Sequence, residues 1–366
     1  MNIKKITTAV AAFAVSVTAV SFTAFAESKG VKISEKNFPD EFFRGYVAAC
    51  FDTDGNGYLS KEERNAVTEI NIESEWEGYN FFKYAKSLVG VEYFTKLEKL
   101  YCNQCMLADL DISKNTKLTH LYCDWSSLKS LDVSKNTKLK YLDCSSNHLS
   151  EIDVSKNTQL IELKCDNNEL EVLNISKNTE LERLDCYTAR LKELDTSKNA
   201  KLKHLNCINN AITSLDVSKN TELEGLCCSR NKLKKLDISS NNKLEYILCS
   251  DNQIAELDVR EKTKLKDLEC RNNKISVLDV SKCTELKELI CEFNDLTELD
   301  LSNNTKLERL HCYNNYLTVL DVSNNPKLEQ LFIKGNRIKE IDISNNRKIK
   351  YFNCDENVKI IKNKGE

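Results

Sequence analysis

The chain has 366 residues, of which 53 are lysine or arginine and 56 are aspartate or glutamate, so its net charge near neutral pH is −3. Nucleic-acid-binding proteins usually carry an excess of positive charge, so this slightly acidic composition argues against nucleic-acid binding. A chain of this length would ordinarily form two domains, unless it is built from stacked repeats.

The N-terminal segment 1–26 predicts a secretory signal peptide. It begins with two lysines, continues with the uncharged apolar run 6–22, and ends with the small residues Ala24 and Ala26 that a signal peptidase reads. The alternative is a membrane anchor, for which the apolar run is barely long enough. Cleavage after Ala26 removes two lysines and no acid, which leaves 51 basic and 56 acidic residues and a net charge of −5. No later run is apolar enough to span a bilayer, so we expect a secreted, extracellular protein without a membrane span.

Residues 27–66 predict a small helical cap around a calcium-binding loop. The loop sequence DTDGNGYLSKEE fits the EF-hand pattern, with acids or amides at positions 1, 3 and 5, glycine at 6 and glutamate at 12. The expected ligands of one structural Ca²⁺ ion are Asp52, Asp54, Asn56, Tyr58 through its carbonyl, Ser60 through a water, and Glu63. Helices are expected over 39–51 and 60–67. The alternative is an acidic surface turn that holds no metal.

From residue 97 to residue 357 the same pattern returns at every twenty-first position, giving thirteen units. One column of the repeat is almost entirely cysteine: Cys102, Cys123, Cys144, Cys165, Cys186, Cys207, Cys228, Cys249, Cys270, Cys291, Cys312 and, after Ile333, Cys354. The unit reads L-x-x-L-x-C-x-x-N-x-L-x-x-L-D-V-S-x-N-T-x, as in residues 139–159. A longer, degenerate repeat over 67–96 precedes the thirteen units, and a tail over 358–366 follows them.

The first half of this unit matches the leucine-rich-repeat signature, with cysteine as the small apolar residue. On these residues the chain resembles the secreted leucine-rich-repeat proteins of Gram-positive bacteria. It is internalin-like in general form, with cysteine-bearing, 21-residue repeats and an N-terminal EF-hand-like loop. The resemblance covers about three quarters of the mature chain. It implies a repeat solenoid, a right-handed coil with a parallel β-sheet on its concave face, and it implies protein ligands.

The columns of the repeat predict which side chains lie inside. Because no unit can bury its apolar side alone, neighbouring units bury it by stacking. In one unit the inward residues are expected to be Leu139, Leu142, Cys144, Leu149, Ile152 and Val154. An asparagine column is expected to form a buried ladder of amides bonded to the backbone: Asn147, Asn168, Asn210, Asn231, Asn252, Asn273, Asn294, Asn315, Asn336 and Asn357. Parallel strands lie about 4.8 Å apart, whereas disulfides need Cβ atoms about 3.8 Å apart. We therefore expect free, buried thiols.

The outward positions of the strands differ from unit to unit, whereas the inward ones hardly change, so the outer face is free to be selected by a partner. The candidate ligand-binding face comprises Tyr101, His120, Tyr122, Tyr141, Arg183, Tyr187, His204, Tyr246, Arg309, His311, Tyr313, Phe332 and Tyr351. Tyrosine and arginine are enriched at protein interfaces. The aromatic residues gather toward the two ends, and acids lie between them at Asp267, Glu269, Glu288 and Glu292. The alternative is a varied surface without a ligand.

The leading interpretation is a secreted protein-binding module that presents this face to an extracellular partner, with a host surface protein as one candidate. Two alternatives stay open: a structural or cell-wall-associated solenoid, and a glycan-binding protein. An enzyme is the poorest fit, because the four histidines lack an adjacent nucleophile and orienting group. The nearest arrangement is Cys227 beside His204, one strand away. The identity of the ligand and the oligomeric state are left open.

Overall fold

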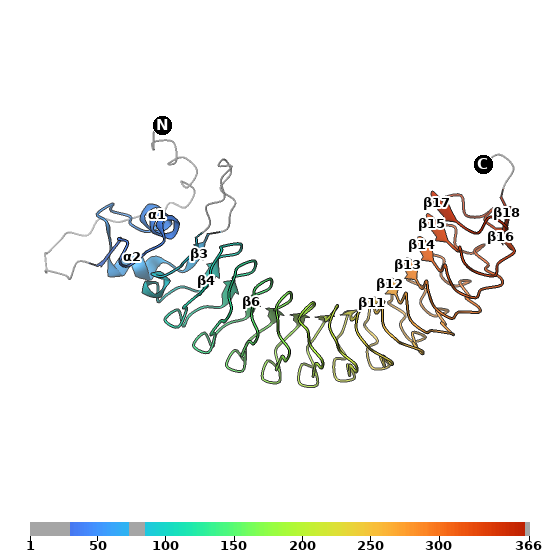
Figure 1. Ribbon diagram of the computed structural model, residues 1–366, viewed down its shortest axis with the longest axis horizontal. Helices are drawn as coiled ribbons and strands as arrows, with labels where there is room; N and C mark the ends of the chain where they lie inside the picture. The colour runs from blue at the N-terminus through green and yellow to red at the C-terminus, as the bar shows by residue number, and fades with distance from the viewer. Residues whose placement is uncertain (1–29, 73–84, 363–366) are drawn as a thin grey trace, which may run out of the picture.

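The computed structural model describes residues 30–72 and 85–362, and the expected signal peptide lies outside them. The chain winds into an arc of stacked coils with a β-sheet along its inner side (Figure 1). Within the described residues this sheet has fourteen strands, and each pairs in parallel with the strand of the next coil. The architecture is therefore the parallel solenoid of 21-residue repeats that the sequence predicts.

Every strand of the large sheet has three residues and begins at the same position of its repeat. The strands are β3 Glu69–Asn71, β4 Lys99–Tyr101, β5 His120–Tyr122, β6 Tyr141–Asp143, β7 Glu162–Lys164, β8 Arg183–Asp185, β9 His204–Asn206, β10 Gly225–Cys227, β11 Tyr246–Leu248, β12 Asp267–Glu269, β13 Glu288–Ile290, β14 Arg309–His311, β15 Gln330–Phe332 and β17 Tyr351–Asn353. The register pairs equal positions, as in Leu100 with Leu121. Because side chains alternate across a strand, the middle residue points into the core and the outer two face the concave side.

The inward columns form one continuous core. In the unit 139–159 the six residues predicted to point inward are 0–8% exposed. The cysteine column is buried from Cys102 to Cys312, and all sixteen cysteines of the chain are free thiols. The Cys102 thiol donates to the carbonyl of Tyr122 in the next strand at 3.3 Å. Burial raises the pKa of Cys207 to about 12, so that thiol stays protonated at neutral pH.

The predicted asparagine ladder is confirmed for most of its length. The Asn147 side-chain oxygen accepts the Leu128 N–H at 3.0 Å, and its amide nitrogen donates to the carbonyl of Cys123 at 3.0 Å. Each amide therefore links its own turn to the preceding coil. The prediction was wrong for Asn357, which is exposed because no further coil of the described chain covers it.

A second asparagine column, which the sequence analysis does not include among the inward residues, forms a ladder that is more deeply buried than the first. In each case the amide nitrogen donates to the carbonyls 24 and 21 residues earlier, as Asn157 does to Val133 at 3.0 Å and Asn136 at 2.9 Å. The members are Asn115, Asn136, Asn157, Asn178, Asn199, Asn220, Asn241, Asn304, Asn325 and Asn346. Two units depart from it. Lys262 is 1% exposed and donates to the side chain of Asn242 at 2.8 Å, while the Cys283 thiol donates to Val259 at 3.4 Å.

The N-terminal cap contains β1 Val31–Lys32, α1 Glu41–Cys50, β2 Tyr58–Leu59 and α2 Lys61–Ala66. The Asp40 side chain accepts the Phe43 N–H at 2.8 Å and so begins α1, and Ser60 with Glu63 forms a capping box that begins α2. Both helices lie where the sequence predicts them.

Contacts join this cap to the solenoid. The ring of Phe51 lies 5.3 Å from that of Phe94, which follows the 3-10 helix η2 Val91–Tyr93. Strand β3 then extends the large sheet by one strand ahead of the thirteen units. The cap therefore covers the first coil and the degenerate repeat continues the sheet.

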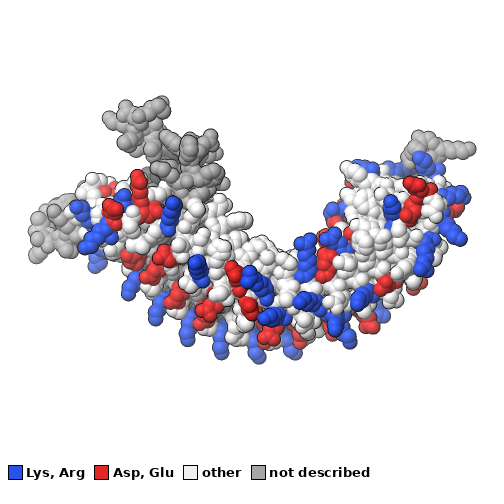
Figure 2. Space-filling view, viewed as in Figure 1, with Lys and Arg blue, Asp and Glu red and all other residues white. Residues whose placement is uncertain are grey.

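At the C-terminal end the chain makes one further strand beyond the repeats. β18 Lys359–Ile361 pairs in parallel with β16 Glu340–Asp342 on the side of the coil opposite the large sheet. The segment expected as a tail thus begins with regular structure. Along the flank, charged side chains alternate in rows (Figure 2), with pairs such as Lys203–Glu182 at 2.8 Å. Within the described residues, no helix is long and apolar enough to cross a membrane.

Candidate functional site

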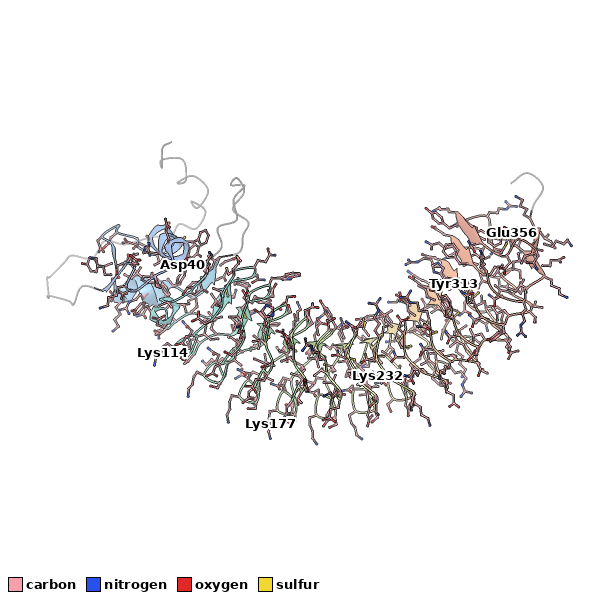
Figure 3. The ribbon with its side chains drawn as sticks, in the orientation of Figure 1. Asp40, Lys114, Lys177, Lys232, Tyr313 and Glu356 are labelled. Atoms are coloured by element: carbon pink, nitrogen blue, oxygen red, sulfur yellow. The ribbon has the colours of Figure 1, made fainter. Side chains whose placement is uncertain are left out.

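The register of the sheet places eleven of the thirteen predicted face residues on the concave side. These eleven stand at the first or third position of a strand, and Tyr187 and Tyr313 lie two residues beyond the ends of β8 and β14. Tyr313 lies on the inner rim, whereas Lys114 and Lys177 project from the outer edge (Figure 3). Because equal positions are adjacent, residues of one column contact each other along the arc.

The N-terminal part of the face carries two stacked ring pairs. Tyr101 stacks on Tyr122 with centroids 5.2 Å apart, and His120 stacks on Tyr141 at 4.6 Å. Burial and the positive charge of Lys99 lower the pKa of His120, which keeps its ring neutral near pH 7. The pairs hold each ring in one orientation, so a partner would meet a rigid aromatic surface.

The next strands carry charges that are mostly neutralised within the face. Arg183 contacts Asp185 at 2.8 Å, and Lys164 contacts Glu162 at 3.1 Å. Burial raises the pKa of Asp166 to about 6 despite a hydrogen bond from the Tyr187 hydroxyl. Side chains that already have partners cost more to rearrange on binding, so this section is a weak candidate for a charged ligand.

A contact across two coils distinguishes the middle of the face. The Tyr246 hydroxyl lies 2.9 Å from Nδ1 of His204, and the two rings are nearly parallel. Gly225 on the strand between them makes this possible, because a Cβ there would lie 1.9 Å from the Tyr246 ring. Nearby, burial raises the pKa of Cys227 to about 12, which makes its thiol a poor nucleophile at neutral pH.

An acidic group follows on β12 and β13. Asp267, Glu269 and Glu288 each bring a carboxylate oxygen within 4.8 Å of the others. Arg309 forms an ion pair with Glu288. Burial and the charge of Glu288 raise the pKa of Asp267 to about 6, and the same causes raise the pKa of Glu269. On the described part of the face, this is the one group of three carboxylates whose oxygens lie this close together.

The C-terminal part of the face is again aromatic. His311 stacks on Phe332 with centroids 4.4 Å apart, and Phe293 meets Tyr313 edge-on at 5.2 Å. A shallow hollow of about 360 Å³ lies beside them, lined by Tyr313, Asn314, Phe332, Lys334, Gly335 and Asn353. The face therefore has an aromatic section at each end and an acidic section nearer the second.

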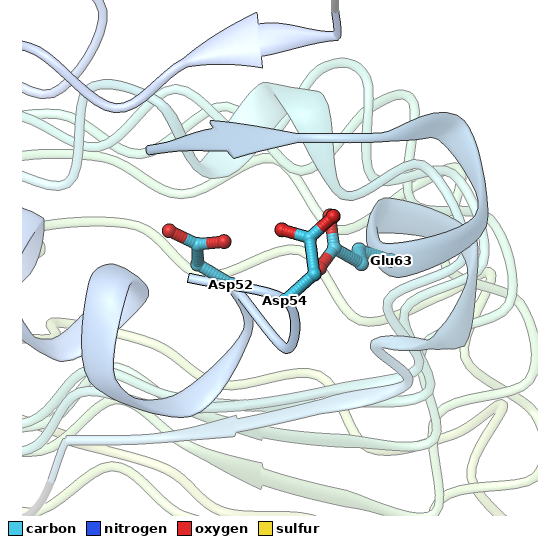
Figure 4. Close-up of side chains that lie close together, drawn as sticks. All are labelled: Asp52, Asp54 and Glu63. Atoms are coloured by element: carbon cyan, nitrogen blue, oxygen red, sulfur yellow. The ribbon is translucent and has the colours of Figure 1, made fainter. Parts of the chain in front are cut away.

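The loop at the cap brings three of its predicted ligands together. Carboxylate oxygens of Asp52, Asp54 and Glu63 lie within 4.8 Å of one another (Figure 4). Gly57 has φ of +79°, which the sharp turn requires, and its N–H donates to Asp52 at 2.9 Å. Glu63 is held by N–H groups of Thr53 at 2.7 Å and Ser60 at 2.9 Å. The backbone thus fixes the carboxylates in a group that fits a hard divalent cation.

No family model matches the sequence, and no curated protein matches it. Solved structures do. The functional domain of InlJ from Listeria monocytogenes, described as including a cysteine ladder, is 34% identical, with a TM-score of 0.76 over 89% of this chain and 76% of that one. The chain belongs to the internalin-like family of leucine-rich-repeat proteins.

This internalin-like chain shares its fold with two more distant proteins. An internalin, InlF of Listeria monocytogenes, matches with a TM-score of 0.80 and 23% identity over 88% of this chain and 97% of that one. A leucine-rich-repeat protein of Leptospira interrogans matches with a TM-score of 0.67 and 21% identity over 82% and 85%. Members of the internalin family are non-enzymatic binding proteins found at the bacterial surface or secreted, so this internalin-like chain is not an enzyme.

Proposed function

We propose that this internalin-like chain is a secreted protein whose concave face binds a protein outside the cell, with a host surface protein as one candidate partner. The observation that carries the proposal is the difference between the two sides of each strand. The inward residues repeat almost unchanged for thirteen units, whereas the outward ones form distinct aromatic and charged sections. Packing of the core requires the inward residues to repeat, but it does not explain why the outward residues form distinct aromatic and charged sections.

The stacked pairs support a protein partner over a glycan. Tyr101, Tyr122, His311 and Phe332 each use one ring face against a neighbour, which leaves less ring surface for a sugar. A protein partner can instead use the edges and polar tips of such rings, which are already ordered and so lose little entropy on binding.

The test is recovery of partners on immobilised residues 27–366 in calcium buffer, from host surface extract and from bacterial wall extract. One variant carries Tyr122→Ala, Tyr141→Ala, His311→Ala and Tyr313→Ala. Its matched control carries Val172→Ala, Val277→Ala and Val319→Ala, which change side chains 64–72% exposed and off the strands of the face. We expect a protein that the wild type and the control recover and the face variant loses.

Other outcomes contradict the proposal. If all three chains recover the same material or none, the concave face is not a protein-binding site. Binding that a glycan array detects and that the face variant loses favours the glycan alternative. Far-ultraviolet circular dichroism of all three chains establishes that the variants keep the fold.

We also propose that the loop Asp52–Glu63 holds one calcium ion that stabilises the cap. The converging carboxylates and the left-handed glycine support this, together with the antiparallel pairing of β2 against β1 that fixes the loop between two helices. In the proposed site, side chains of Asp52, Asp54, Asn56 and Glu63 supply oxygens, with Tyr58 and Ser60 completing the shell. An ion that binds only the folded chain stabilises it by mass action.

Calcium titration followed by the thermal midpoint tests this second proposal. We expect calcium to raise the midpoint of the wild type and of Glu62→Gln, a neighbouring exposed carboxylate, but not of Glu63→Gln. Equal responses of Glu62→Gln and Glu63→Gln would mean that the loop is not the site.

A further inference from the structure

The acidic section of the concave face is incompletely neutralised. Asp267 and Glu288 occupy paired positions on β12 and β13, and Glu269 lies on the same side of β12 as Asp267. Carboxylates this close repel each other. The ion pair of Arg309 with Glu288 provides one positive charge, and the other two carboxylates of the group have no ion pair among the described residues.

Two buried acceptor atoms in and beside this section lack hydrogen-bond donors. In the part of the chain that the structure describes, neither Oδ1 of Asp267 nor Oε2 of Glu292 has a hydrogen-bond partner. Glu292 is 3% exposed; Arg271 lies 3.8 Å from its Oε1, the His311 ring lies 3.9 Å from its Oε2, and the Tyr313 hydroxyl forms a hydrogen bond with the carboxylate. Buried carboxylate oxygens without donors are costly to a folded protein, so they indicate a place where a ligand supplies the donors.

The residues beside Glu269 indicate which kind of cation fits. Leu248 and Ile290 flank it in the same column, on β11 and β13, and both are half-buried on the otherwise polar middle of the face. A hydrated metal ion gains nothing from two aliphatic neighbours. An arginine or lysine side chain gains from both features, because its methylene stem packs on apolar surface while its head group donates to carboxylates.

We infer that the section formed by Asp267, Glu269 and Glu288, with Leu248 and Ile290 beside it, receives an arginine or lysine side chain from an extended segment of the partner protein. The inference rests on the proposed function, since it names the chemistry of the partner at that face. The guanidinium of arginine suits the section best, because it can donate to two carboxylates at once.

The test uses a fluorescent peptide in which arginine alternates with leucine, and a second peptide with citrulline in place of arginine. Citrulline keeps the shape and removes the charge. Fluorescence anisotropy against residues 27–366 measures both. We expect the citrulline peptide to bind at least about tenfold more weakly. We expect the double variant Asp267→Asn and Glu269→Gln to weaken the arginine peptide by about tenfold or more.

The control removes the same charge elsewhere. Glu256→Gln with Glu298→Gln changes two exposed carboxylates outside the concave strands and should leave peptide binding unchanged. Equal effects of the two double variants would overturn the inference, because they would show attraction by net charge alone. Terbium luminescence in the Glu63→Gln background gives a further check, since a signal lost on adding Asp267→Asn would identify a metal site instead.

Two results separate this inference from the proposed function. A natural partner lost by the aromatic face variant but retained by Asp267→Asn with Glu269→Gln would support the function and overturn the inference. A partner that neither variant loses would overturn the function as well, whatever the peptide does.

Discussion

Removing one amide from the second ladder should destabilise the solenoid by an amount that its contacts allow us to estimate. Asn157 is fully buried, and its side chain donates two hydrogen bonds to the carbonyls of Val133 and Asn136. Each bond contributes about 1 kcal/mol net, and the cavity left by alanine costs about 1 kcal/mol more. The side-chain oxygen Oδ1 is buried without a hydrogen-bond partner in the described residues, so removing it relieves a desolvation penalty of about 1 kcal/mol. We therefore expect Asn157→Ala to lower the free energy of unfolding by about 2 kcal/mol.

Urea denaturation of wild type, Asn157→Ala and Lys156→Ala provides the measurement, with the exposed Lys156 as the control. Amide hydrogen exchange should also quicken first in the coils on either side of residue 157, because stability in a repeat array is largely a nearest-neighbour property. Asn157→Asp keeps the size of the side chain but turns a donor into an acceptor facing two carbonyls, and it should cost more than alanine. The reasoning is refuted if Asn157→Ala and Lys156→Ala unfold at the same urea concentration, or if Asn157→Asp is the milder change.

Three further outcomes follow from the face and the core. Gly225→Ala should displace the ring of Tyr246 and break its hydrogen bond to His204. A shift of the His204 ring signals in nuclear magnetic resonance spectra would report this change. The free energy of unfolding should fall by no more than about 1–3 kcal/mol. Iodoacetamide followed by mass spectrometry should label Cys50, the one exposed cysteine of the described chain, well before the buried column, and a reactive column would contradict its burial. Burial raises the pKa of Asp267 to about 6, so its charged form opposes folding above pH 6, and this destabilisation fades as the pH falls toward 4. Asp267→Asn should therefore raise the thermal midpoint at pH 7 but not at pH 4. An equal rise at both pH values would show that ionisation of Asp267 is not the cause.

The repeat made most of the fold predictable from the sequence. A 21-residue period fixes which side chains share a column, and the alternation of a strand then decides which columns point inward. Within one unit this was enough to identify all six core residues between Leu139 and Val154. The same logic placed eleven of the thirteen candidate face residues at outward positions of the strands, because each coil repeats the geometry of the one before.

A contact that skips a coil was beyond that reasoning. The bond between His204 and Tyr246 joins two members of one column that are 42 residues apart, and it depends on the missing side chain of Gly225 between them, so comparing neighbouring units does not reveal it. The depth of the second asparagine ladder was missed for a similar reason. Asparagine after serine is a common turn signal, and only the stacked coils show that Asn136 and its equivalents also reach back to the coil before.

The second asparagine ladder is interrupted in two neighbouring units, at Lys262 and Cys283, and the coils on either side of this interruption are joined by more hydrogen bonds than the coils within it. On either side of Lys262 and Cys283, neighbouring coils are joined by paired amide bonds, but at these two positions one lysine contact and one thiol contact replace them. In an array held together by nearest neighbours, the weakest junction decides where cooperativity fails. Under a pulling force or in mild denaturant, the coils before residue 262 and those after residue 283 would separate as two folding units. The acidic section of the face lies on β12 and β13, the strands that directly follow these two positions, so we expect any bending of the arc to occur beside its charged surface.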